Sequence, residues 1–282
     1  MAKAQRKDDD VKTDAVTAPE SAPVDAAWQA PTKIGRVSLA VIIGVVALIN
    51  LPMLHYFLWR SPPKVIVQLG PHPSMEAQPP IVQTFVDDYS NPATVQEKYF
   101  STGGLWRSVE GALLSPGVKN NPLWLKASLP NDVAVEFDVK SMSPEGDIKV
   151  EIFGDGTDHA SGYVLIHGGW NNSISIIARL DEHAPSFTTL QAQAAGQDLV
   201  AAGLYRNDTR IRVEANPFKV ELGRLYHWRI ERREKVLSWF IDGQPFMRFE
   251  DPLPLTGKGH DRFAFSSWEA QLYFDNLKIE AL

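Results

Sequence analysis

The most prominent hydrophobic pattern in this sequence is one uninterrupted apolar run from Val37 to Trp59. The run is 23 residues long, contains no Lys, Arg, Asp or Glu, and separates a polar N-terminal segment from a large polar C-terminal region. A helix of that length, rising about 1.5 Å per residue, reaches roughly 35 Å and can cross a hydrocarbon core of about 30 Å. The run therefore predicts one transmembrane helix over residues 37–59.

A cleaved signal peptide is the alternative interpretation of this run. Its apolar core is typically about 7–15 residues long and ends at small residues. Here Leu58, Trp59 and Arg60 follow instead, and Tyr56 and Trp59 are amphipathic residues suited to the headgroup level. We therefore expect a retained single-pass anchor, with the membrane as the first partner.

The distribution of basic residues predicts the orientation of the anchor. Lys33 and Arg36 precede the run and Arg60 and Lys64 follow it, so the immediate flanks balance. Four further basic residues lie in the N-terminal segment: Lys3, Arg6, Lys7 and Lys12. Basic residues favour the cytoplasmic side, so we expect a cytoplasmic N-terminus and an exported C-terminal region. The chain has no cysteine, which favours a bacterial periplasm, and hence the inner membrane, over a disulfide-rich cell surface.

Two polar segments flank the predicted helix. Residues 1–36 are rich in Ala, Asp, Lys and Pro and show no hydrophobic period, which predicts a disordered cytoplasmic tail. The tail carries six basic and six acidic residues, so it is not a nucleic-acid-binding arm. Residues 60–81 contain six prolines and predict an extended linker.

From residue 82 to residue 282 the hydrophobic period changes to short alternating runs. Apolar and polar positions alternate from Val133 to Val139 and from Ile148 to Ile152, as in half-buried strands. Further strands are predicted over residues 162–167, 173–180, 209–213, 226–231, 236–241, 262–266 and 272–279. Turn residues separate several of these runs, as at Asp242-Gly243. The pattern predicts an all-β domain, a β-sandwich over residues 82–282.

Five segments of this domain resemble one known family. They are Phe85–Tyr89, Gly104–Leu113, Tyr226–Glu231, Phe240–Pro245 and Phe274–Ile279. Together they are similar to concanavalin A-like (laminin-G-like) jelly rolls, especially the bacterial domains grouped with 3-keto-disaccharide hydrolases. The resemblance implies a jelly-roll β-sandwich but no particular activity, because the fold hosts lectins, glucanases and adhesion modules.

The first candidate binding site consists of His167, as a candidate ligand contact, and the loop that follows it. Gly168 and Gly169 predict a hairpin turn with positive φ, from which Trp170, Asn171 and Asn172 project. An aromatic ring that stacks on a pyranose and amides that bond its hydroxyls suit sugar recognition. The alternative is a Trp that closes the end of the sandwich beside Asn residues that tolerate left-handed backbone. His167-Gly168-Gly169 also resembles an esterase oxyanion loop, but the partner motif Gly-x-Ser-x-Gly is missing.

Acidic residues give two weaker candidates. Glu136 and Asp138 share one face of a predicted strand, either as catalytic carboxylates or as the solvated side of that strand. The Glu-x-Asp-x-x-Glu run expected of a glucanase on this scaffold is missing. Asp155 and Asp158 lie in an acidic turn that offers a structural calcium site or an Asx turn. We expect no other cofactor.

Arg210 and Arg212 lie in the most basic part of the domain. They flank Ile211 and so share one strand face, which suits an anionic glycan, a phospholipid surface or an acidic protein; the alternative is a solvated face with ion pairs. In the predicted membrane helix, Ala40 and Gly44 form a small-xxx-small pair, and Asn50 interrupts the apolar surface. These three residues predict contact with a partner helix of another membrane protein.

Together these features predict a membrane-anchored periplasmic module that binds cell-envelope glycan without catalysis. Two alternatives remain open at this point. One is an accessory or scaffold subunit of an inner-membrane complex, and the other is a glycoside-processing enzyme.

Overall fold

The computed structural model describes residues 39–48, 50–51, 79–215 and 218–282, in two compact units, Met1–Gly70 and Pro71–Leu282. The predicted tail, part of the predicted transmembrane run and most of the predicted linker lie outside the described residues. In the first unit, residues 39–48 and 50–51 are helical. No helix within the described residues is long and apolar enough to cross a membrane. Membrane crossing by the run 37–59 therefore stays a prediction.

Within the helical part of this run, the Asn50 amide has a partner in its own helix. Its Nδ2 donates a hydrogen bond of 2.7 Å to the Val46 carbonyl oxygen, one turn earlier. The amide therefore does not require a partner helix to satisfy this donor. The predicted role of Ala40 and Gly44 in helix contact stays a prediction.

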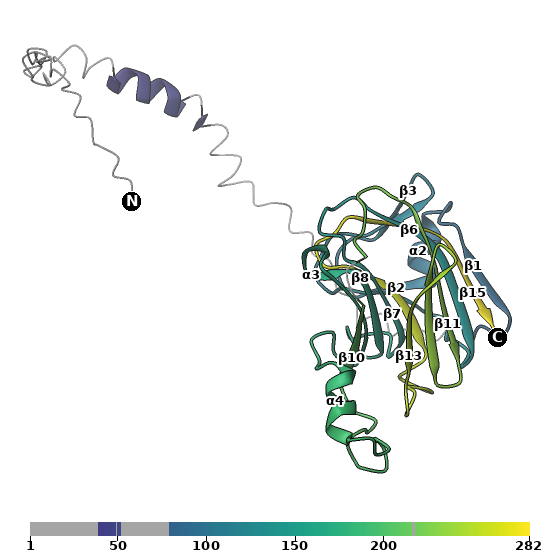
Figure 1. The fold of residues 1–282 in the computed structure, drawn as a ribbon. Coiled ribbons are helices and arrows are strands. Elements are labelled where there is room, and N and C mark those ends of the chain that lie inside the picture. Colours follow the sequence, from purple (N-terminus) through teal and green to yellow (C-terminus); the bar gives the residue numbers. More distant parts are fainter. Residues whose placement is uncertain (1–38, 49, 52–78, 216–217) are drawn as a thin grey trace, which may run out of the picture. The chain divides into compact units, whose positions relative to one another are not determined.

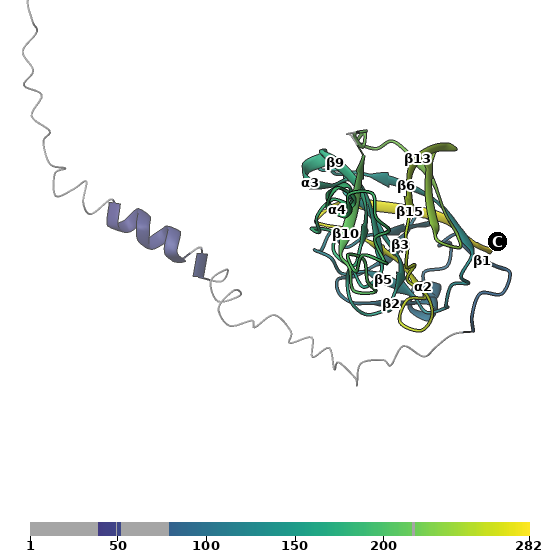
Figure 2. The same ribbon diagram turned by 60° about the horizontal axis from the view of Figure 1, so that its bottom comes forward.

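The second unit is a sandwich of two antiparallel sheets, so the all-β prediction is confirmed (Figures 1 and 2). The eight-stranded sheet has the order β13 (Gln244–Glu250), β12 (Val236–Ile241), β11 (Tyr226–Arg233), β6 (Val133–Ser141), β15 (Leu272–Ala281), β4 (Ala112–Leu114) and β3 (Arg107–Val109), with β1 (Thr84–Asp87) paired to the C-terminal half of β15. The seven-stranded sheet has the order β10 (Ile211–Ala215), β9 (Ile174–Arg179), β8 (Tyr163–Gly168), β7 (Ile148–Gly154), β14 (Arg262–Ser266), β5 (Leu123–Leu125) and β2 (Tyr99–Ser101).

Three short helices join these strands: α2 (Ala93–Lys98), α3 (Gly169–Asn172) and α4 (Phe187–Ala194). Figure 1 shows α4 beside β10, at the edge of the seven-stranded sheet. The sandwich begins slightly earlier than the predicted boundary at residue 82. Ile81 is buried, and its backbone N–H donates to Ser128 O at 3.0 Å.

The core lies between the two sheets, as the alternating pattern predicts. Phe137 of β6 is fully buried, and its ring lies 5.3 Å from that of Phe265 on β14 and 5.4 Å from that of Trp228 on β11. Side chains of both sheets therefore interdigitate around one aromatic centre, where each buried aromatic contributes apolar burial and edge or stacking contacts.

The outer face of the seven-stranded sheet is also covered, which the pattern did not predict. Lys149 and Glu151 of β7 alternate outward, yet both are buried. Across the ladder Lys149 pairs with Ile166, and Ile166 pairs with Ile176. Ile166 and Ile176 belong to a second, smaller apolar cluster on this face. Apolar and charged side chains thus lie side by side under the surrounding loops.

A buried ion pair holds one of these loops in place. Arg179, at the end of β9, donates from Nε to Asp251 Oδ2 at 2.8 Å and from Nη1 to the carbonyl oxygens of Asn207 and Thr209. Asp251 also accepts the hydroxyl of Tyr163 at 2.6 Å. Because the pair is hydrogen-bonded on all sides, its burial is compensated, and the loop that leads to Arg210 is fixed.

Candidate functional site

Three adjacent hollows lie on the outer face of the seven-stranded sheet. The central cleft has a volume of about 550 Å³, within the range of small-molecule sites. Its lining consists of Glu145, Asp147, Lys149, Ile166, Trp170, Asn171, Glu182, His183, Trp268 and Glu269. Glu182 and His183 also line a hollow of about 490 Å³ that contains Arg210, here the Arg210 hollow. Trp170 also lines a hollow of about 610 Å³ that contains Arg212, here the Arg212 hollow.

Two half-exposed tryptophans line the central cleft. Trp170 is 40 % exposed and Trp268 is 42 % exposed. The Trp170 ring meets His183 edge-on at 5.5 Å, and the Arg212 guanidinium lies 5.4 Å from its centroid. Trp170 therefore lies in the cleft and does not close the end of the sandwich. Both rings keep surface on which a planar or sugar-like ligand can stack.

A left-handed turn carries Trp170. Gly168 has φ 70°, and Trp170, Asn171 and Asn172 follow with φ of 48°, 58° and 58°. Consecutive left-handed residues are costly for non-glycine side chains, so other contacts must stabilise the turn. Asn172 provides them, because its Nδ2 donates to Val220 O at 2.7 Å and its Oδ1 accepts Val220 N–H at 2.8 Å.

This turn divides the predicted ligand residues into two groups. Asn171 is exposed and lines the central cleft, as sugar recognition requires. Asn172 uses both ends of its amide on the Val220 backbone, so the amide positions the turn. The predicted positive φ of the turn is confirmed at Gly168, whereas the other left-handed positions fall on Trp170 and the two asparagines and not on Gly169.

The prediction that His167 contacts a ligand is wrong. His167 is fully buried on the inner face of β8, where its ring stacks on Phe218 at 5.3 Å and its Nε2 donates to Phe218 O at 2.9 Å. Burial lowers the pKa of His167 to about 4, so the ring is neutral. The two-residue period explains the correction, because His167 shares its side of the strand with Tyr163 and Leu165.

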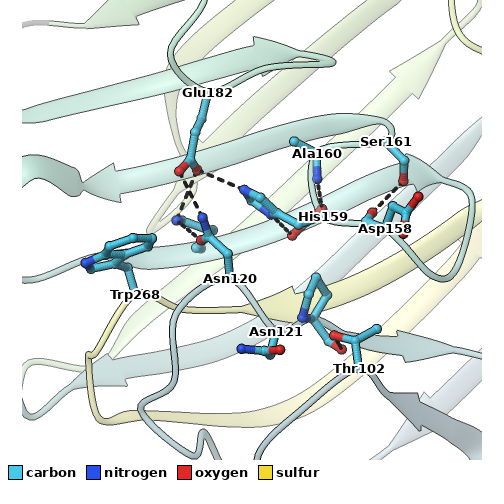
Figure 3. Close-up of polar contacts among 12 residues, drawn as sticks. Thr102, Asn120, Asn121, Asp158, His159, Ala160, Ser161, Glu182 and Trp268 are labelled. Carbon is cyan, nitrogen blue, oxygen red and sulfur yellow. Dashed lines mark hydrogen bonds and ion pairs between the residues drawn. The ribbon is translucent and has the colours of Figure 1, made fainter.

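A charged network forms an ionic wall that the central cleft shares with the Arg210 hollow, because Glu182 lines both and His159 lines the hollow (Figure 3). Lys149 Nζ lies 3.1 Å from Glu182 Oε2 and donates to Asn120 Oδ1 at 2.8 Å. His159 lies between two carboxylates, with Nδ1 2.7 Å from Glu151 Oε1 and Nε2 3.5 Å from Glu182 Oε2. Each charge thus faces an opposite charge, which compensates much of the cost of burying it.

The pKa values follow from this geometry. Burial acts to raise the pKa of Glu182, but the hydrogen bond with His159 and the charge of Lys149 outweigh it and lower the pKa to about 2. Burial acts to lower the pKa of His159, but the hydrogen bonds with Glu151 and Glu182 raise it to about 9. His159 is therefore a cation at neutral pH and part of the ionic wall.

Asp147 stands apart from this wall. It is 7 % exposed, its Oδ2 accepts the Trp268 backbone N–H at 2.5 Å, and Lys149 Nζ lies 3.9 Å from the same oxygen. Burial raises the pKa of Asp147 to about 6, with Lys149 acting in the opposite direction. Asp147 thereby fixes the backbone beside Trp268. It presents to the cleft a carboxyl group whose nearest cation, Lys149 Nζ, is 3.9 Å away.

The predicted arginine face reaches the same region but is already neutralised. Arg212 donates from Nε to Glu214 Oε1 at 2.7 Å and from Nη1 to Glu182 O at 2.9 Å. Arg210 Nη1 lies 4.0 Å from Asp181 Oδ2. Both arginines thus lie beside the segment 181–182, as their shared face predicts, but a protein carboxylate faces each of them. An anionic ligand would compete with these pairs.

The acidic candidates act in structural pairings. Asp155 Oδ1 accepts the backbone N–H groups of Thr157 at 2.7 Å and of Asp158 at 2.8 Å, which is an Asx turn. Among the residues that the structure describes, no group of three or more His, Asp or Glu side chains could hold a metal ion. The predicted calcium site at Asp155 and Asp158 therefore gains no support.

Glu136 and Asp138 lie on the other sheet, away from the cleft. Asp138 Oδ1 is 2.8 Å from His227 Nδ1, and Glu136 pairs with Arg229. These contacts run across the outer face of the eight-stranded sheet between β6 and β11. The structure supports the interpretation of a solvated strand face with ion pairs.

The sequence pattern did not predict several of the other residues that line the cleft. Glu182, His183 and Trp268 lie in loops with no motif that marks them, and Asp147 precedes a predicted strand. Lys149 gave a misleading signal, because a charged residue at an outward position usually indicates a solvated face.

Comparison with known proteins gives similarity in architecture alone. No known family and no curated protein matches the sequence. Among solved structures, the chain is similar to the carbohydrate-binding module CBM66 from Bacillus subtilis, with 14% identity over 65% of this chain and 96% of that chain and a TM-score of 0.47. It is also similar to a Bacillus licheniformis β-glucanase (11% identity, 71% and 98% covered, TM-score 0.44) and to sheep galectin-11 (13% identity, 57% and 97% covered, TM-score 0.37). These β-sandwich proteins include binding modules and enzymes, and all three scores lie below 0.5. These similarities therefore assign no function to this chain.

Proposed function

We propose that this chain is a non-catalytic glycan-binding module, anchored in a bacterial inner membrane by the run 37–59 and exposing its sandwich to the periplasm. The observation that carries the binding role is the pair of half-exposed rings, Trp170 and Trp268, in one polar cleft of about 550 Å³. Aromatic rings match the apolar face of a pyranose, and the Asn171 amide and the neighbouring carboxylates can bond its hydroxyls. The anchor and its orientation rest on the hydrophobic run and the basic residues of the tail.

The state of the buried carboxylates favours binding over glycoside hydrolysis. A retaining glycosidase needs one carboxylate free as a nucleophile and a second as an acid, about 5–5.5 Å apart. Glu151 and Glu182 are instead held by His159 and Lys149 in the ionic wall. Asp147 is engaged with the Trp268 backbone. These groups shape the cleft, and the two rings and the Asn171 amide are among its ligand-facing groups.

The scaffold alternative has less support. One of its sequence arguments was a polar Asn50 beside the Ala40/Gly44 pair in an apolar helix, and the Asn50 amide donates to Val46 O of the same helix. We therefore favour glycan binding over a scaffold role.

A retention assay tests the proposal on the full chain in mild detergent, with immobilised bacterial cell-envelope glycan as the probe. Trp170→Ala and Trp268→Ala should each lower the affinity roughly tenfold, since an exposed anchor ring at a binding surface carries much of the binding energy. The melting temperature should change little, because neither ring is in the core.

Two matched variants separate stacking from hydrogen bonding. Trp170→Phe keeps an aromatic face and should lose less affinity than Trp170→Ala. Asn171→Gly removes the amide but tolerates the left-handed backbone, so it should weaken binding without loss of stability. Failure of the wild-type chain to retain any envelope glycan would refute the proposed function.

A further inference from the structure

In the three hollows the positive side chains are paired with protein carboxylates, whereas some of the negative side chains are not. This difference determines the charge of the glycan that fits them. Every lining cation already faces a carboxylate of the protein. The pairs are Lys149 with Glu182, His159 with Glu151, Arg210 with Asp181, and Arg212 with Glu214. A ligand therefore finds no unpaired positive charge in the described lining.

Three lining carboxylates, in contrast, have no cation partner within the part of the chain that the structure describes. Glu145 lines the central cleft, and Asp158 and Asp208 line the Arg210 hollow. All three are exposed, and among the described residues their carboxylate oxygens take part in no hydrogen bond or ion pair. Their negative charges are thus available to a ligand, and they give the hollows a net attraction for cations.

A buried carboxylate at the cleft points to the same kind of ligand. Asp147 is more than nine-tenths buried and lines the central cleft, but only its Oδ2 accepts a hydrogen bond. No donor to Oδ1 is found in the described part of the chain. Oδ1 is not one of the fully buried side-chain atoms without a partner, so it is accessible from the cleft, and a donor brought by the ligand could bond it.

The aromatic lining is compatible with cations as well. Lys119 Nζ lies 5.0 Å from the Trp268 centroid, and the Arg212 guanidinium lies 5.4 Å from that of Trp170. Each ring is still about two-fifths exposed. An ammonium group of the ligand that approaches an exposed ring face would gain a cation–π attraction.

We infer that the glycan bound in these hollows is an amino-sugar polymer with free, positively charged amino groups. This inference rests on the proposed function and specifies its ligand class. Ammonium groups would pair with Glu145, Asp158 and Asp208 and donate to Asp147 Oδ1, while the sugar rings stack on the tryptophans. Because neighbouring hollows share Glu182 or Trp170, the ligand is an extended chain and not a single sugar.

Calorimetric titration of the full chain in detergent with three oligosaccharides tests the inference. The probes are a glucosamine hexamer, an N-acetylglucosamine hexamer and a galacturonate hexamer, which are cationic, neutral and anionic. The glucosamine hexamer should bind tightest, with an affinity that falls as salt is raised, and the galacturonate hexamer should bind weakest.

Charge-removing variants locate the effect. Glu145→Gln, Asp158→Asn and Asp208→Asn should each weaken glucosamine binding about two- to fivefold, as expected for exposed ion pairs, and weaken N-acetylglucosamine binding less, because the amides can still bond sugar hydroxyls. Glu234→Gln is the matched control, because this exposed residue lies in the hairpin between β11 and β12 of the other sheet and loses the same charge.

Three outcomes overturn the inference. If the neutral hexamer binds as tightly as the cationic one, the free carboxylates do not select the ligand, although the proposed glycan-binding function stands. If the galacturonate hexamer binds tightest, the hollows select anionic and not cationic ligands. If hexalysine binds as tightly as the glucosamine hexamer, the hollows recognise charge alone. Absence of binding to any glycan would refute the proposed function instead.

Discussion

His159 occupies a position that makes the folded state sensitive to pH. It is mostly buried between Glu151 and Glu182, whose hydrogen bonds outweigh the effect of burial and raise its pKa to about 9. In the unfolded chain the pKa of a histidine is about 6.5. The folded state therefore binds a proton more tightly than the unfolded state.

This difference predicts a loss of stability at alkaline pH. The stabilisation from protonated His159 is fully present below about pH 6.5 and is lost as the pH rises through about 9. The free energy of unfolding should fall by on the order of 2 kcal/mol across this window, measured by urea unfolding at several pH values.

A substitution assigns the effect to this residue. His159→Gln should be less stable than wild type at pH 6 and should show little further loss between pH 6.5 and 9. His183→Gln is the matched control, because this histidine is mainly exposed. An unchanged alkaline slope in His159→Gln would show that another group is responsible.

At the scale of elements, the turn between β8 and β9 decides where Trp170 lies. A Cβ on Gly168 would meet Asn172 Oδ1 at 2.5 Å and Val220 Cγ2 at 2.7 Å, and φ at this position is 70°. Gly168 is thus required both for its left-handed backbone and for the close approach of the Asn172 amide to Val220.

Gly168→Ala should therefore destabilise the sandwich and weaken glycan retention. Gly203→Ala is a suitable control, since Gly203 has φ 71° and a methyl group added there would meet no atom within 4 Å. We expect about 1 kcal/mol of loss in Gly203→Ala from the backbone alone and a further 1–3 kcal/mol in Gly168→Ala from the clash. Equal losses in urea unfolding would contradict the packing role of Gly168.

At the scale of the whole molecule, the predicted anchor leads us to expect the sandwich in the periplasm. A reporter that is active only in the periplasm, fused after Leu282, should be active in a bacterial host. Protease added to intact spheroplasts should digest the sandwich, because a 23-residue apolar span is long enough to cross the bilayer once. A reporter active only in the cytoplasm serves as the matched fusion and should be silent; the reverse pattern would overturn the orientation.

Much of the strand layout could be predicted from local pattern. The predicted runs 236–241 and 262–266 coincide with β12 and β14, because their alternation and flanking turn residues are local properties of the chain. The first five strands have three or four residues each, too few to show a period. β13 contains Pro245, and its place at the sheet edge tolerates that residue.

The sequence by itself determined that the C-terminal region forms an all-β sandwich and that Trp170 and Asn171 project from a turn. Both properties depend on residues near one another in the chain. Only the tertiary structure decided that His167 faces the core, that Lys149 is buried in an ionic wall, and that Trp268 lines the cleft with Trp170. These outcomes depend on which loops cover which sheet face, and contacts between distant segments leave no periodic trace in the sequence.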